Sequence, residues 1–123
     1  MSHEEFKMQL EGELARVTTE LETIAIHNNE TDDWIAVPNP VEMNNADPID
    51  NANATEEWNR RRAVMAQLEI RYRNIVRAID KFETNTYGKC EISGDPIENE
   101  RPEANPAART NMANIDREKE LPI

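Results

Sequence analysis

The sequence predicts a mainly α-helical protein in which two long helices form an antiparallel coiled-coil hairpin, followed by a small globular knob and a short C-terminal helix. Two apolar stripes with alternating spacings of three and four residues predict the hairpin, because such a stripe follows one side of a helix. Of the 123 residues, 32% are charged and only 37% are hydrophobic. So little apolar surface suits one extended element with a small attached unit better than two full-sized cores.

The first helix is expected to begin at the start of the chain. Ser2 and Glu5 form a capping-box pattern, in which each side chain satisfies an amide donor of the first turn. The apolar stripe of this helix consists of Phe6, Leu10, Leu14, Val17, Leu21 and Ile24. Charged residues fall between these positions, which predicts one buried stripe on a charged helix.

A long irregular connection is predicted from residue 27 to 53, with a tip loop at about 28–52. This stretch is rich in Asn and Asp and contains Pro38, Pro40 and Pro48, which cannot lie inside a regular helix. Trp34 and Ile35 stand out as apolar residues in the connection. We favour their folding back onto the hairpin, and the alternative is an exposed anchor for a partner protein.

The second helix is expected to start close to Asn53, which forms a second capping pattern with Glu56. Its stripe consists of Met65, Leu68, Tyr72, Ile75, Ile79 and Phe82, with Trp58 one heptad before Met65. Two stripes joined by one connection are buried most simply against each other, which predicts a helical hairpin over residues 1–84. The basic cluster Arg60–Arg62 is expected to pair with glutamates of the first helix.

A small knob is predicted over residues 85–123. The stripe stops after Phe82, Gly88 supplies a turn, and the segment up to residue 110 is rich in Pro and Asn. A short helix is expected from Thr110 to Leu121, although Met112 and Ile115 give it only a weak amphipathic pattern.

Charge and composition exclude several classes of protein. With 14 Lys and Arg against 25 Asp and Glu, the net charge of −11 makes nonspecific binding to nucleic acid unfavourable. No apolar run approaches the roughly 20 residues of a membrane span, and the first residues lack a leader pattern, so we expect a cytoplasmic protein. The single cysteine, Cys90, excludes an intramolecular disulfide.

The segment Tyr87–Ile97 resembles the zinc-finger opening of the DksA/TraR family of bacterial regulators, which is a tyrosine or phenylalanine, a glycine, any residue and then C-x-x-C-G-x-x-I. The segment Arg101–Thr110 matches the stretch that follows in that family. A second cysteine pair comes next in the family, at positions that correspond to Asn111 and Asn114. The resemblance therefore implies a degenerate zinc finger whose four positions are Cys90, Ser93, Asn111 and Asn114.

Zinc binding by this degenerate site is not expected. A structural zinc site needs four thiolate or imidazole donors, and serine or a neutral amide replaces them poorly. The two histidines, His3 and His27, are expected on the surface, so we predict no metal and no other cofactor. Packing should hold the knob instead, through the apolar residues Tyr87, Ile92, Ile97, Pro102 and Met112. A further hypothesis is that the two asparagines hydrogen-bond nearby turns.

A second resemblance lies in the connection, where Asp47–Ala52 matches the D-x-x-D-x-A tip sequence of the transcription-acting members. In that family the coiled coil enters the secondary channel of RNA polymerase, and the tip acts near the active centre. The resemblance implies this role for Asp47, Asp50 and Ala52. The alternative is that the two aspartates only form Asx turns before the second helix.

The leading functional hypothesis is thus a zinc-independent, monomeric transcription regulator that binds RNA polymerase. The alternative is a non-catalytic structural or stress-related adaptor that uses the helical hairpin to bind another protein. Catalysis is not expected, because an exposed pair of carboxylates lacks the desolvation that separates their pKa values. The positions that correspond to the family's guanosine tetraphosphate site are Asn74, Asn105 and Ile115, which implies an absent or weakened response.

Overall fold

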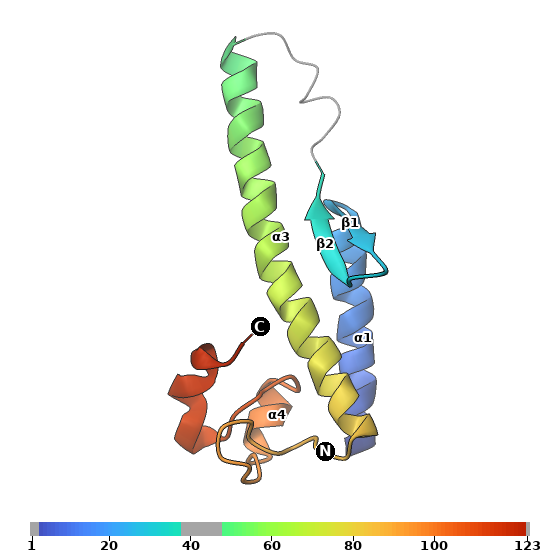
Figure 1. Cartoon of the computed structure of the whole chain (residues 1–123), viewed down its shortest axis with the longest axis vertical. Helices are drawn as coiled ribbons and strands as arrows, with labels where there is room; N and C mark the ends of the chain where they lie inside the picture. The colour runs from blue at the N-terminus through green and yellow to red at the C-terminus, as the bar shows by residue number, and fades with distance from the viewer. Residues whose placement is uncertain (1–2, 38–47, 123) are drawn as a thin grey trace. The chain divides into compact units, whose positions relative to one another are not determined.

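The computed structural model describes residues 3–37 and 48–122, with side chains described for 3–37 and 55–122. Figure 1 shows the elements in chain order, which are α1 (His3–Glu22), β1 (Ala25–Asn28), β2 (Asp33–Ala36), α3 (Pro48–Glu83), α4 (Glu100–Ala104) and a 3-10 helix, η1 (Met112–Glu120). The prediction of a mainly helical protein is confirmed. None of the described helices is long and apolar enough to cross a membrane.

The chain forms two compact units. Unit 1 comprises Met1–Arg16 and Tyr72–Ile123, and unit 2 comprises Val17–Arg71. The boundary between the units crosses both α1 and α3, whereas the sequence suggested a division after residue 84. The knob therefore forms one unit with the first turns of α1 and the last turns of α3.

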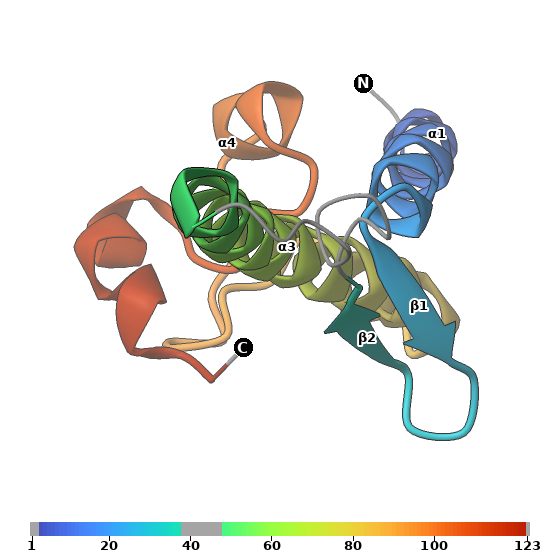
Figure 2. The same ribbon diagram turned by 90° about the horizontal axis from the view of Figure 1, so that it is seen from above.

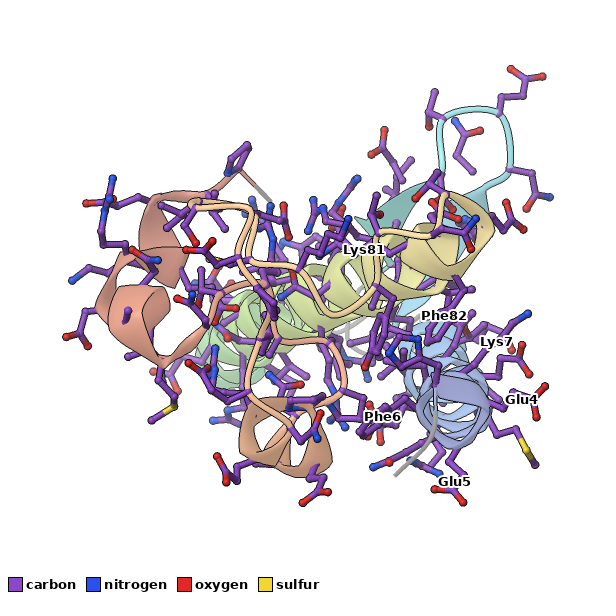
Figure 3. The ribbon with its side chains drawn as sticks, turned by 90° about the horizontal axis from the view of Figure 1, so that it is seen from below. Glu4, Glu5, Phe6, Lys7, Lys81 and Phe82 are labelled. Atoms are coloured by element: carbon purple, nitrogen blue, oxygen red, sulfur yellow. The ribbon has the colours of Figure 1, made fainter. Side chains whose placement is uncertain are left out.

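In unit 1, the first turns of α1 lie beside the last turns of α3. The His3 and Phe82 rings meet edge to face with their centroids 6.2 Å apart, and Phe82 stacks on Tyr87 at 4.2 Å. Figure 3 shows Phe6 on the inner side of α1 and Glu4 on the outer side. The buried apolar residues of the two helices in this unit are Phe6, Leu10, Tyr72, Ile75 and Ala78. Most of these belong to the predicted stripes.

Helix α3 ends in a Schellman-type cap. Asn85 has a φ of 58°, in the left-handed region that asparagine tolerates better than most residues. The amide of Thr86 then donates to the carbonyl of Lys81 at 2.9 Å, which satisfies one of the last free carbonyls of the helix. The predicted end of the stripe at Phe82 is therefore one residue from the end of the helix.

Unit 2 contains a β-hairpin over residues 25–36, so the prediction of irregular chain is wrong for residues 27–36. Strands β1 and β2 pair antiparallel, with Ile26 opposite Ile35 and His27 opposite Trp34 (Figure 2). The turn closes through a 2.8 Å bond from the Asp32 amide to the Asn28 carbonyl, with Asp32 at a φ of 59°. Strands of four residues are too short to show a clear alternating pattern in a sequence.

The two faces of this hairpin differ. Trp34 is 4% exposed and Ala25 is 5% exposed, so both lie in the core of unit 2, together with Val17 and Leu21. The His27 ring stacks on Trp34 at 4.5 Å, and its Nε2 lies 2.6 Å from Oδ1 of Asp32. His27 is thus half-buried rather than a plain surface residue. The expectation that Trp34 folds back is confirmed, whereas Ile35 is exposed.

Helix α3 begins at Pro48, five residues before the predicted start at Asn53. Proline fits the first turn of a helix, because the amide hydrogen that it lacks would have no partner there. Arg60 pairs with Glu57 of its own helix at 2.6 Å, whereas we expected a partner on the first helix. Coiled-coil packing along the whole length of the hairpin stays a prediction.

Replacing Trp34 with alanine should lower the free energy of unfolding by about 3–5 kcal/mol, because a buried indole leaves a large cavity. Ile35→Thr, at the exposed neighbouring position, keeps a β-branched side chain and should change it by less than about 0.5 kcal/mol. Urea unfolding followed by circular dichroism measures both values. Equal losses in the two variants would contradict the assignment of the inner and outer faces.

Candidate functional site

The four positions of the degenerate zinc finger come together in unit 1. Nδ2 of Asn114 donates to Sγ of Cys90 at 3.7 Å and to Oδ1 of Asn111 at 2.9 Å. Nδ2 of Asn111 in turn lies 3.5 Å from Oγ of Ser93. Residues from two turns, separated by some 20 positions in the sequence, therefore form one polar cluster, which we call the polar quartet.

A tight turn places Cys90 and Ser93 on the same side of the chain. The Cys90 amide donates to the Asp95 carbonyl at 2.7 Å, and the Gly94 amide donates to the Cys90 carbonyl at 2.9 Å. Gly94 has a φ of 78°, a conformation that residues other than Gly, Asn and Asp rarely adopt. The Asp95 amide also donates to Oγ of Ser93 at 3.3 Å, which fixes this hydroxyl within the turn.

The other half of the quartet is a helix cap. Asn111 is the N-cap residue of η1, and its Oδ1 accepts the amide hydrogen of Asn114 at 3.2 Å. Asn111 is only 6% exposed. Its side chain thus satisfies the Asn114 amide in the first turn of the helix and links the start of that helix to Ser93. Asparagine is well suited to this position because it can donate and accept at the same time.

The surroundings of the Cys90 thiol lower its pKa. Cys90 is 3% exposed, and burial alone would raise the pKa. Hydrogen bonds from the backbone of Ser93, Asn111 and Ile92, and from the Ser93 hydroxyl, outweigh burial and lower the pKa to about 7. The turn therefore keeps the backbone donors that stabilise a thiolate at this position.

The quartet does not fit a zinc ion. Only Cys90 can supply a thiolate, and Oδ1 of Asn111 already accepts hydrogen bonds from the backbone and side chain of Asn114. Nδ2 of Asn114 is a donor aimed at the thiol, so it presents a hydrogen rather than a lone pair towards the centre of the cluster. Within residues 3–37 and 48–122, no group of three or more His, Cys, Asp and Glu residues is arranged to hold a metal.

The apolar core of the knob differs in part from the prediction. Ile97 and Pro102 are buried as expected, but Met112 is 53% exposed because it lies at the start of η1, outside the core. Tyr87 is half-buried, and its hydroxyl donates to the Pro106 carbonyl at 2.8 Å. Small residues that the sequence did not single out complete the core, namely Pro106, Ala108 and Thr110.

An ion pair between the buried Arg109 and the more exposed Glu91 lies beside the quartet and was not predicted. Nε and Nη2 of Arg109 contact the two carboxylate oxygens of Glu91 at 2.8 and 3.0 Å. Nζ of Lys81, near the end of α3, contacts the same carboxylate at 2.9 Å. Nη1 of Arg109 donates to the Pro122 carbonyl at 2.7 Å. The ion pair therefore joins α3, the turn after Cys90 and the C-terminal residues.

A second carboxylate extends this network. Glu118 of η1 accepts the backbone amide of Arg109, and it also lies 3.5 Å from Nη2 of Arg101. Nε of Arg101 donates to the carbonyl of Thr110 at 3.1 Å. The partners lie 9 to 18 positions apart in the sequence, so no periodic pattern could have revealed them.

The charged groups of this network shift one another's pKa values. Burial opposes ionisation of Glu91, but the hydrogen bonds and positive charges of Arg109 and Lys81 lower its pKa to about 2. The pKa of Arg77 is lowered, first by burial and then by the like charge of Arg109. Glu91 is thus the carboxylate that holds several cations together.

The residues of the predicted tip are less fully described. Asp47 lies outside the described residues. Asp50 and Ala52 lie in the first two turns of α3, and their side chains also lie outside the described part of the chain. Their role in partner binding stays a prediction.

In chain order, the described elements are a helix, a β-hairpin, a longer helix and a small knob built on two facing turns. The structure is similar to that of transcription factor DksA2 from Pseudomonas aeruginosa, with a TM-score of 0.57 and 17% sequence identity over 93% of this chain and 74% of that chain. No family model matches the sequence, and no curated protein matches it significantly. The likeness at this identity establishes the fold.

Replacing Asn111 with alanine should lower the free energy of unfolding by about 1–2 kcal/mol, because the N-cap bond and a buried hydrogen bond are lost. Asn99→Ala is the matched control, since Asn99 occupies the N-cap position of α4 without a side-chain cap bond. Its effect should stay below about 0.5 kcal/mol in the same urea titration. An Asn111→Ala variant with the same free energy of unfolding as the wild type would show that the quartet does not stabilise the knob.

Acid should weaken the knob through Glu91. Its pKa of about 2 in the folded protein lies below the roughly 4.3 of an unfolded glutamate. The stabilisation is therefore complete above about pH 5 and is lost as the pH falls towards 2. The melting temperature of Glu91→Gln should lie below that of the wild type at pH 7, and the gap should close between pH 5 and 2.

Glu100→Gln, which changes an exposed carboxylate of the same knob, serves as the control for this pH series. Its melting curve should follow that of the wild type throughout. A gap between wild type and Glu91→Gln that does not change with pH would contradict the role of the Glu91 charge.

Proposed function

We propose that this chain is a transcription regulator that binds bacterial RNA polymerase through the secondary channel and changes transcription initiation. The observation that carries the proposal is the likeness in fold to a transcription factor over 93% of the chain. The net charge of −11 supports action on a protein rather than on DNA. The regulator acts by binding and performs no catalysis of its own.

The start of α3 is the proposed contact with the polymerase. Asp50 is the third residue of α3, and Ala52 is the fifth. These two residues of the motif belong to the start of a 36-residue helix, and a long helix is narrow enough for a channel that a globular domain could not enter. Carboxylates at such an end can bind basic side chains, backbone amides or the surroundings of a magnesium ion.

The regulator is also proposed to work without zinc. One thiolate, one hydroxyl and two amides that bind each other form a poor donor set for that ion. The Glu91–Arg109 ion pair, the cap at Asn111 and the apolar core support a knob that folds without metal. This part of the proposal separates the chain from a four-cysteine regulator.

Multi-round transcription by purified bacterial RNA polymerase from a ribosomal promoter tests the function. Wild-type protein should change the amount of transcript, and Asp50→Asn should need about tenfold more protein for the same effect, because a charged hydrogen bond contributes roughly 1.5–3 kcal/mol. Asp80→Asn, the same change at an exposed position near the other end of α3, should behave as wild type.

Two controls complete this experiment. Protein that has been treated with a zinc chelator and then dialysed should act like untreated protein, and its zinc content should be far below one ion per chain. No change in transcription and no polymerase binding by the wild type would reject the proposal and favour the adaptor hypothesis. Loss of activity after chelation would reject zinc independence alone.

A further inference from the structure

The outer face of the β-hairpin carries two exposed isoleucines side by side. Ile26 of β1 and Ile35 of β2 are direct partners in the antiparallel register, so their side chains lie on the same face. They are 62% and 58% exposed. Single exposed apolar residues are common on protein surfaces, whereas adjacent ones form a patch that favours contact with another molecule.

The fold itself does not require isoleucine at these positions. Trp34 and Ala25 occupy the inner face and anchor the hairpin in the core of unit 2. A β-branched residue is favourable in a strand, but threonine would satisfy that preference without exposing a second methyl group. The apolar character of Ile26 and Ile35 therefore adds little to the stability of unit 2.

The charges around this pair limit what can cover it. Asp33 lies two residues before Ile35 and thus on the same face of β2, and Glu30 lies in the turn. Both are exposed. With a net charge of −11 per chain, a second copy would bring like charges together at this rim. Anionic membranes and nucleic acids are disfavoured for the same reason.

We infer that Ile26 and Ile35 form a docking surface for a protein whose apolar recess is rimmed by lysine and arginine. This inference rests on the proposed function and places the recess on RNA polymerase. Residues 37–46 separate β2 from Asp47 in the sequence, a stretch that spans at most about 35 Å. A partner as large as a polymerase can therefore contact both the hairpin and the start of α3.

The double variant Ile26→Thr/Ile35→Thr tests the surface. Threonine keeps the β-branch, so the circular dichroism spectrum and the melting temperature should match those of the wild type. The dissociation constant for RNA polymerase, measured by fluorescence anisotropy of labelled protein, should rise at least about tenfold, because apolar contact area is lost. Val64→Thr, an equivalent change at an exposed position of α3, should leave it unchanged.

The rim is tested by Glu30→Gln/Asp33→Asn, which should weaken binding at low salt and lose its effect as salt screens the charges. If the isoleucine variant binds RNA polymerase with the same dissociation constant as the wild type, the docking surface is overturned and the proposed function stays intact. Absence of wild-type binding would overturn both. If the wild type sediments as a dimer and the isoleucine variant as a monomer, a second copy of the chain is the occupant and the inference is overturned.

Discussion

The knob depends on the ion pair between Glu91 and Arg109. Arg109 is 6% exposed, and a guanidinium in such a place must be neutralised and hydrogen-bonded to be tolerated. Glu91 provides both through a two-point contact, while Lys81 and the Pro122 carbonyl tie the pair to α3 and to the C-terminal residues. Removing Glu91 would leave the buried Arg109 guanidinium without its carboxylate, so the pair holds the surrounding turns in one arrangement.

Under the proposal that the knob folds without metal, this ion pair supplies part of the cohesion around a polar quartet with one thiol. In zinc-dependent peptides the metal supplies roughly 10 kcal/mol of folding free energy. Each neutral hydrogen bond of the quartet contributes only about 0.5–1.5 kcal/mol, so the quartet alone is no substitute. The quartet instead orients two turns, and the ion pairs and the buried residues around Ile97 and Pro102 provide the stronger cohesion.

Unit 2 is built around a β-hairpin that has one face in the core and one face exposed. Trp34 and the stacked His27 attach a two-stranded sheet that would be marginal by itself. That attachment leaves Ile26 and Ile35 paired on the exposed face of the sheet. The hairpin and the start of α3 thus give the proposed regulator two contact points within one unit.

The two long helices could be predicted from the sequence, because the spacing of apolar residues such as Phe6 and Leu10 is a local property of each helix. The quartet could also be located, since its four positions follow a known motif order. The strands at 25–36, the helix start at Pro48 and the Glu91–Arg109 pair could not. The strands and the ion pair depend on partners far along the chain, such as the core around Trp34 or a guanidinium 18 residues from its carboxylate, whereas a proline in a first helical turn looks the same in sequence as one in a loop. Local pattern thus determined the helices, and tertiary packing decided which polar and apolar side chains meet.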